Sequence, residues 1–345
     1  MNMCDIKSML LVIIICILFI RCNTQYSSSY TFRNVTVRVK VSNKTHPWMK
    51  IFVPRADNIN DILKTIDRKV KIISFEKQQI PILLRNSINN VRRIKRITIT
   101  SCGIEKLEPG FVKNVTRIFE FDLSHNNLRE IKYGVFNNIV ISRLFLNNNK
   151  ICEIQRKAFT NMTNLEMIIL NNNRLTIWDS TWFLKTPVRH VDFSSNMIET
   201  LPPGAFEYYK QFRKETYGEF YYINFNDNIL TKLYKNSLPE VPILWFLFLE
   251  KNFIEEIEQG YFENIEKMEV LKLGHNKLVS FGNGILDQMD VRYLKLNDNY
   301  LQSVDVNLTE ILNIEGNPLN TECKKQWDER KKRDRDVFER YFYNS

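Results

Sequence analysis

The chain has 345 residues, 44% of them hydrophobic, and a formal net charge of +10. It contains four histidines, and its six cysteines show no metal-site spacing. No glycine-rich phosphate loop, HExxH motif or nucleophile elbow occurs in the sequence. Because catalysis needs such converging groups, we expect no enzymatic activity, no metal site and no cofactor.

Residues 1–24 have the organisation of a secretory signal peptide. Lys7 gives a positively charged start, residues 9–20 are apolar, and Cys22 and Thr24 are small residues suited to cleavage. A membrane anchor is the rival interpretation, but this run falls short of the ~20 residues that a spanning helix needs. We therefore expect a secreted, extracellular product with no membrane span.

Residues 25–69 do not follow the pattern of the chain that comes after them. Residues 35–41 alternate Val-Thr-Val-Arg-Val-Lys-Val, which is typical of a strand with one buried face. We predict that this segment is an N-terminal cap over the exposed end of a repeat array.

The N-terminal part is also strongly basic. Residues 26–100 carry sixteen Lys and Arg against four Asp and Glu, while residues 101–345 sum to −3. This end can meet an acidic surface such as a glycosaminoglycan, a bacterial envelope or an acidic protein. A role in solubility alone is the other interpretation. Nucleic acid is not expected as a partner of a secreted chain.

Residues 70–319 repeat with a period near 24. Residues 165–175 read Leu-Glu-Met-Ile-Ile-Leu-Asn-Asn-Asn-Arg-Leu, with apolar residues at positions one, four, six and eleven and asparagine at nine. The ninth position of the eleven copies is taken by Gln78, Cys102, Asn126, Asn149, Asn173, Asn196, Asn228, Asn252, Asn276, Asn299 and Asn317. Such a fixed period is the signature of a repeat array.

The repeat predicts a stack of parallel strands. Positions four and six lie on one face of a short strand, and the long return between copies requires parallel pairing. A second apolar set, such as Ile131, Phe136 and Ile139, fills the space behind the sheet. The asparagine amide both donates and accepts, so it can satisfy backbone groups at a bend inside the stack.

This pattern resembles the extracellular leucine-rich repeat proteins with a period near 24. The resemblance implies an α/β fold: a curved solenoid of about eleven repeats with a parallel sheet on its concave face. The order of signal, short N-terminal cap, repeats, glycans and charged C-terminal helix is similar to insect secreted leucine-rich immune proteins and to Toll-like receptor ectodomains. By that resemblance the chain binds a protein or pathogen-surface ligand in innate immunity. The alternative is a matrix or adhesion component similar to the small leucine-rich proteoglycans.

The predicted binding face consists of bulky side chains that project from the strands away from the core. An aromatic residue at such a position has no role in packing the core, so a cluster of them indicates a partner site. These residues are Phe145, Met167, Ile169, Tyr221, Tyr222, Trp245, Phe246, Phe248 and Tyr293. The interval from Asn196 to Asn228 is about eight residues longer than the period, and we expect residues 207–219 to loop out. That insertion either adds to a binding face, covers the aromatic residues, or is a tolerated surface insertion.

Residues 320–345 are expected to form a charged, helical C-terminal cap. Residues 315–319 with Cys323 and Trp327 resemble the start of the cap of this family. Residues 330–333, Arg-Lys-Lys-Arg, look like a proprotein-convertase site, and a solvated helix face is the alternative.

Five asparagines lie in Asn-x-Ser/Thr, the acceptor motif for glycans, and we expect all of them off the strands. They are Asn34, Asn43, Asn114, Asn161 and Asn307.

Three cysteines remain after removal of the signal. Cys102 occupies a ladder position and should be buried. Cys152 belongs to a repeat two strands further on. Its Cα should lie at least ~9 Å from that of Cys102, beyond the ~7 Å limit for a disulfide. We predict that Cys323, near the terminus, links two chains into a dimer; a free thiol beside Trp327 is the alternative.

Overall fold

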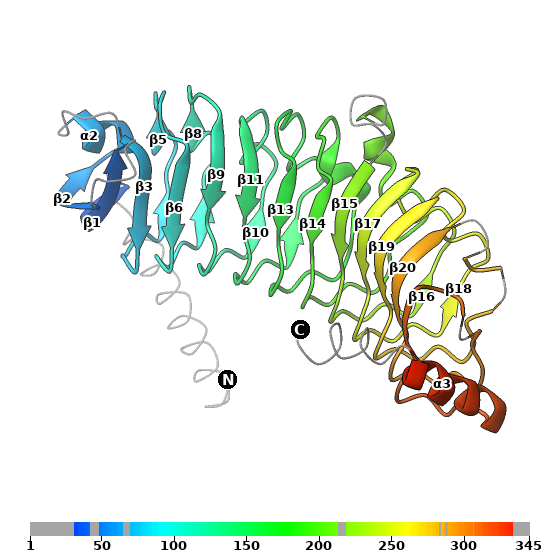
Figure 1. Ribbon diagram of the computed structural model, residues 1–345. Helices are drawn as coiled ribbons and strands as arrows, with labels where there is room; N and C mark the ends of the chain where they lie inside the picture. The colour runs from blue at the N-terminus through cyan, green and yellow to red at the C-terminus, as the bar shows by residue number, and fades with distance from the viewer. Residues whose placement is uncertain are drawn as a thin grey trace, which may run out of the picture.

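The computed structural model describes residues 31–41, 48–64, 70–212, 219–282, 284–286, 289–305 and 307–333. The expected signal peptide and Asn43 lie outside these ranges. The described chain is a curved solenoid built on one sheet of thirteen strands, in the order β2-β1-β3-β6-β9-β11-β13-β14-β15-β17-β19-β20-β21 (Figure 1). The expectation of a leucine-rich-repeat-like solenoid with a parallel sheet is confirmed.

Eleven of these strands are parallel and line the inner face, one for each copy of the repeat. They are β3 (Val70–Glu76), β6 (Arg96–Thr100), β9 (Ile118–Asp122), β11 (Ile141–Phe145), β13 (Met167–Ile169), β14 (His190–Asp192), β15 (Glu219–Asn224), β17 (Ile243–Phe248), β19 (Lys267–Lys272), β20 (Asp290–Lys295) and β21 (Ile311–Asn313).

The N-terminal end of the sheet is extended by two antiparallel strands, β1 (Phe32–Val41) and β2 (Met49–Ala56). The alternating segment 35–41 lies in β1, and Val35, Val37 and Val39 are buried as its pattern predicts. Helix α2 (Ile59–Lys64) follows β2. Hydrophobic side chains at the end of the stack are therefore covered by two additional strands of the same sheet.

The outer side of the coils holds short strands and turns. Two-residue strands pair there: β4 (Ile82–Leu83) with β7 (Lys106–Leu107), β5 (Ile88–Asn89) with β8 (Val112–Lys113), β10 (Glu130–Ile131) with β12 (Glu153–Ile154), and β16 (Lys232–Leu233) with β18 (Glu256–Ile257). Between this layer and the sheet, Phe136 and Phe159 stack with ring centroids 5.7 Å apart. The second apolar set predicted from the sequence thus forms the core behind the sheet.

The ninth-position asparagines form a continuous internal column. Asn173 is typical: its amide nitrogen donates to the carbonyls of Leu146 at 3.0 Å and Leu170 at 2.9 Å, and its Oδ1 accepts from the Ile151 backbone N–H at 3.0 Å. The same three kinds of bond recur from Asn126 to Asn317. Each amide therefore joins its own turn to the turn before it.

The two copies without asparagine keep the column in other ways. Cys102 is 1% exposed and lies in the column, as predicted. Its thiol donates to the carbonyls of Thr100 at 3.2 Å and Phe75 at 3.4 Å. Gln78 reaches back into the cap, where its Oε1 accepts from the Thr36 N–H at 2.9 Å.

Position eight, just before the column, adopts a left-handed backbone in every copy. His125 and His275 have φ of 56° and 55° there, and Gly316 has 71° in the last copy. This conformation turns the chain sharply after each strand. The two histidines are therefore turn residues.

The insertion between Asn196 and Asn228 does not loop out as a whole, so that expectation is wrong for its first half. Residues Glu207–Phe212 form the 3-10 helix η2, after an earlier one, η1 (Ser180–Phe183). Tyr208 and Tyr209 on η2 are 4% and 1% exposed, and their hydroxyls donate to the carbonyls of Val188 and Glu219. The extra residues supply two aromatic rings to the core, a role that the surplus length alone does not reveal.

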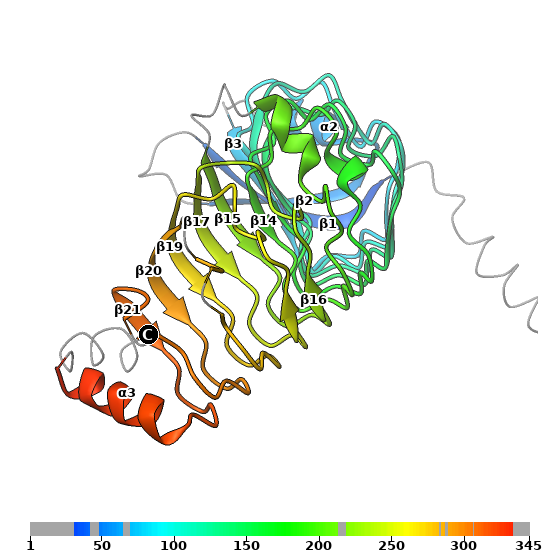
Figure 2. The same ribbon diagram turned by 90° about the vertical axis from the view of Figure 1, so that its right-hand side faces the viewer.

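The C-terminal end is covered by helix α3 (Thr321–Arg333), which lies beyond β21 (Figure 2). Cys323 and Trp327 pack inward from α3, at 5% and 3% exposed. Arg330 is also buried, and its guanidinium donates to the carbonyls of Thr309 at 2.8 Å and Glu310 at 2.7 Å. The solvated helix face expected for residues 330–333 is therefore present at Lys332 and Arg333, which are exposed, but not at Arg330; cleavage at this run stays a prediction.

Replacing one amide of the column should destabilise the whole stack. We expect Asn173→Ala to lower the free energy of unfolding by about 1–3 kcal/mol, because it leaves the Ile151 N–H buried without a partner and removes one of the two amide donors to each of the Leu146 and Leu170 carbonyls. Urea titration followed by circular dichroism measures this. Asn171→Ala, two residues earlier and half-buried, is the control and should change stability little. Equal stability of the two variants would contradict the role assigned to the column.

Candidate protein-binding face

The candidate site lies on the inner sheet, where strand residues alternate between core and surface. On β17, Leu244 and Leu247 are buried, whereas Trp245, Phe246 and Phe248 are half-buried and face away from the core. The same pattern on β15 buries Phe220 and Ile223 and leaves Tyr221 40% exposed. The strands β14, β15, β17, β19 and β20 lie side by side on one curved sheet in this part of the solenoid (Figure 2).

The centre of this surface is an aromatic cluster of four rings: His190, Tyr222, Phe246 and Phe248. His190 stacks on Tyr222 with centroids 4.4 Å apart and planes at 16°. Tyr222 meets Phe248 edge-to-face at 5.2 Å, and Phe246 lies 6.3 Å from Phe248. Such contacts hold rings in fixed orientations and leave their outer faces available to a partner.

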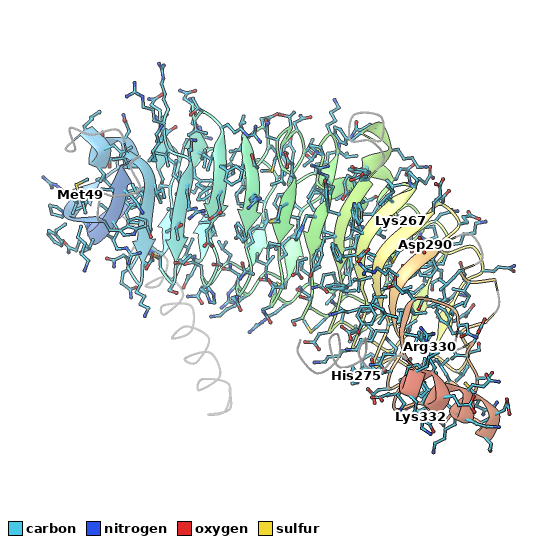
Figure 3. All side chains as sticks on the ribbon, in the orientation of Figure 1. Met49, Lys267, His275, Asp290, Arg330 and Lys332 are labelled. Carbon is cyan, nitrogen blue, oxygen red and sulfur yellow. The ribbon has the colours of Figure 1, made fainter. Side chains whose placement is uncertain are left out.

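Cationic side chains lie over several of the rings. The Lys272 ammonium is 4.6 Å from the Phe248 centroid, and the Arg189 guanidinium is 4.5 Å from that of Tyr221. At the edge of the sheet Lys267 lies 5.9 Å from Trp245 (Figure 3). The surface therefore combines aromatic area with positive charge, a composition suited to apolar and acidic groups of a partner.

An ion pair lies on the C-terminal side of the cluster. Lys295 Nζ lies 2.6 Å from Glu250 Oε1, and these side chains are 24% and 11% exposed. The pair joins β20 to the turn after β17, across one intervening strand. Burial, and then the charge of Glu250, raises the pKa of Tyr293 to about 12, so this phenol stays neutral.

Two groups of the cluster have altered acidity. Burial lowers the pKa of His190 to about 4, against a smaller opposing effect of Asp192. Burial raises the pKa of Tyr222 to about 12. At neutral pH both rings are uncharged, and His190 stacks on Tyr222 as a neutral imidazole.

The structure places the nine predicted residues in one band but not in one cluster. Along the third position of the repeat, Met167, His190, Tyr222, Phe246, Val270 and Tyr293 are successive neighbours. Phe145 and Ile169 pair on β11 and β13, on the N-terminal side of His190. Tyr293 is separated from Phe246 by Val270. The insertion's described half packs into the core and does not lie over these rings.

His190 belongs to the aromatic cluster but is not among the nine residues predicted from the sequence. The clue was available, because His190 occupies the same third position as Tyr222 and Phe246. The Glu250–Lys295 pair was not predicted either.

The glycan acceptors occupy different settings. Asn114 and Asn307 are exposed, and Asn161 is half-buried. Asn34 lies within β1, so the expectation that no acceptor falls on a strand is wrong. The strand continues through Asn34 although its φ is 49°, and its side chain is exposed. Glycosylation at these positions stays a prediction.

The premise that Cys323 is exposed is wrong. Its thiol is buried under α3 and donates to the Val304 carbonyl at 3.5 Å, whereas Cys152 is exposed. An intermolecular bridge through Cys323 stays a prediction, but it now requires α3 to detach from the stack.

Within the described ranges, no three side chains of the metal-binding types come together. The described helices include none with the length and hydrophobicity needed to cross a bilayer.

Protonation of His190 should weaken the fold. In the unfolded chain, His190 has its ordinary pKa of 6.5 and is protonated below that pH. In the folded chain its pKa is about 4, so it binds the proton only near pH 4. Stability from this group is therefore present above pH 6.5 and lost as the pH falls toward 4. After discounting for the partly exposed ring, we expect a contribution on the order of 1 kcal/mol. Urea unfolding at several pH values should show a shallower acid loss in His190→Asn than in the parent; parallel curves would argue against it.

Thiol reactivity should follow burial. Iodoacetamide should modify Cys152 in the folded chain and spare the two buried thiols, Cys323 and Cys102. Burial also raises the pKa of Cys102 to about 11. Mass spectrometry of peptides counts the adducts, and all three cysteines should react in denaturant. Modification of Cys323 as fast as Cys152 would show that α3 does not protect it.

Comparisons with known proteins agree with this architecture. The family description "BspA type Leucine rich repeat region" matches residues 69–214 in six copies, and "Leucine rich repeat" matches residues 246–301. Osteomodulin of Bos taurus is 22% identical over 72% of this chain, and lumican of Gallus gallus is 26% identical over 59%. The chain covers 56% of that osteomodulin and 66% of that lumican.

Two solved structures share the fold. The receptor in the TLR13–ssRNA13 complex has a TM-score of 0.55 at 16% identity, covering 64% of this chain and 32% of that one. The Drosophila Toll–Spatzle complex has a TM-score of 0.51 at 18% sequence identity, covering 68% of this chain and 38% of that one. Eleven copies of one motif on one sheet, together with these family matches, show that the chain belongs to the leucine-rich repeat proteins.

Proposed function

We propose that this protein is an extracellular leucine-rich repeat protein that binds a protein ligand on its concave face, as a matrix or adhesion component. The observation that carries the proposal is the aromatic cluster with its overlying cations on the inner sheet. Trp245 and Phe248 contribute nothing to the core behind the sheet, so their bulk is best explained by contact with another molecule.

The chemistry of the face suits a protein partner. Tyr222, Phe246 and Phe248 are held by mutual ring contacts, so little side-chain entropy is lost when they are covered. Tyrosine and tryptophan are enriched among residues that dominate binding energy, and Lys272 and Arg189 add a positive rim. We infer a partner with apolar side chains bordered by carboxylates.

The matrix role is preferred to the immune role because of the sequence relatives. Osteomodulin, lumican and fibromodulin, all of the leucine-rich proteoglycan type, match this chain at 22–29% identity. The Toll-like receptor structures share the fold at lower identity, which does not carry their ligands over. The innate-immune role implied by the early resemblance is therefore the second candidate, and extracellular location is part of the proposal.

The double variant Trp245→Ala/Phe248→Ala should lose the ligand without losing the fold. The partner would first be captured from extracellular-matrix extract and from body fluid of the source organism, then purified for surface plasmon resonance. We expect affinity to fall at least about thirtyfold, as for two buried hot-spot rings, with a thermal midpoint close to that of the parent.

The matched control is Tyr133→Ala/Tyr300→Ala, which removes two aromatic residues, 59% and 57% exposed, that lie off the inner sheet. Its affinity should equal that of the parent. If the concave variant binds as well as this control, the site is not on the concave face. A partner found in body fluid and absent from matrix extract would transfer the assignment to the immune role.

A further inference from the structure

A second surface, distant from the aromatic cluster, concentrates positive charge. We call it the basic edge and define it as Lys71, Arg92, Arg93, Lys95 and Arg117. These residues lie at or just before the starts of β3, β6 and β9, which are neighbours in the sheet (Figure 1). Arg92, Arg93, Lys95 and Arg117 are exposed, and Lys71 is half-buried.

The repeat brings these cations close together. The Lys95 N–H donates to the Lys71 carbonyl at 2.8 Å, which puts the two lysines at equivalent positions of adjacent turns. The Thr116 hydroxyl donates to the Arg92 carbonyl at 2.7 Å, so the segment before β9 lies against the segment before β6. Adjacent turns are ~4.8 Å apart, and the five charged residues therefore lie on three successive turns, those of β3, β6 and β9.

Acidic groups pair with only one of these five cations. In the described part of the chain, Lys71, Arg92, Arg93 and Lys95 form no ion pair, whereas the Arg117 guanidinium donates to the Ser142 hydroxyl at 2.9 Å and lies 3.9 Å from Glu166. The acidic neighbours on the same strands are already engaged: Glu76 with Arg38 at 2.8 Å and Glu120 with Arg96 at 2.8 Å. Unpaired like charges repel one another, so the edge gains free energy when it binds a polyanion.

We propose that the basic edge is a binding site for a sulfated polysaccharide. Arginine guanidinium groups match the oxygens of sulfate in paired hydrogen bonds, and the lysines add point charges. The sequence Val91-Arg92-Arg93-Ile94-Lys95-Arg96 is a short basic run of the kind found in heparin-binding patches. A polymer with regularly spaced sulfates bridges the charges of the three turns.

Single-stranded nucleic acid is the competing polyanion, and the surroundings favour it less. Binding of single strands relies on aromatic rings on which bases stack. The ring next to Lys95 is Phe119, and the Arg143 guanidinium already lies 4.7 Å from its centroid. Phe119 is 43% exposed, but it is a single ring that already contacts a cation, whereas the edge carries five cationic side chains; this composition suits a sulfated sugar chain better than a row of stacked bases.

The test uses the full secreted glycoprotein and heparin as the probe. Affinity is measured by surface plasmon resonance for the parent, for Arg92→Ala/Arg93→Ala/Lys95→Ala, and for a control with the same loss of charge. That control is Lys324→Ala/Lys325→Ala/Lys332→Ala, on exposed positions of α3 at the opposite end of the solenoid (Figure 3). Fully desulfated heparin and a single-stranded RNA of similar charge are run in parallel.

We expect the basic-edge variant to lose about tenfold in heparin affinity, the control to stay within twofold, and desulfated heparin not to bind. Circular dichroism should give all three proteins the same thermal midpoint. An equal loss in both triple variants would show diffuse attraction and overturn the proposal, as would tighter binding of the RNA at the same residues. Trp245→Ala/Phe248→Ala should keep heparin binding, which makes this test independent of the concave-face ligand.

Discussion

The asparagine amide at the ninth position of each repeat is the contact on which the rest of the structure depends. At that point the chain leaves the sheet through a left-handed residue, and backbone groups turn into the interior, away from water. Asn126 shows the solution: its Oδ1 accepts from the Cys102 and Ile104 N–H groups, and its Nδ2 donates to the Ile99 and Leu123 carbonyls. One side chain satisfies two successive turns, so each turn fixes the next one in register.

This register determines what the inner sheet can display. Because the fourth and sixth positions always point into the core, the third and fifth always point out, and equivalent residues from different repeats become neighbours. His190, Tyr222 and Phe246 are far apart in sequence and adjacent in space for this reason. A preformed surface of this kind loses little entropy on binding, which suits it to hold a ligand. The basic edge follows from the same register, since Lys71 and Lys95 occupy equivalent positions.

The period of the sequence was enough to predict the strands, the column and the side of the sheet on which each residue lies. It was enough because a single physical requirement, burial of positions one, four, six and eleven, repeats in every turn. Residues that break the period were not predictable in this way. Tyr208 and Tyr209 lie in the inserted residues, where the repeat pattern does not indicate which side chains face the core. The structure shows that both are buried in it.

Contacts between side chains were also beyond the pattern. The repeat places Glu250 and Lys295 on the concave face but says nothing about their reach across β19 to form an ion pair. Cys323 looked exposed because it lies near the end of the repeats, yet α3 folds back and buries it. Asn34 falls on a strand because β1 continues through a residue with positive φ. In each case the outcome depends on packing between distant segments.

Hydrogen–deuterium exchange measured by mass spectrometry tests the central claim most directly. The N–H groups bound by the column, from Ile104 to Leu301, should exchange at one slow rate set by cooperative unfolding of the whole stack. If instead these groups exchange as fast as surface turns, or in blocks that open independently, the amide column does not unite the repeats. The inner face would then not be a preformed surface.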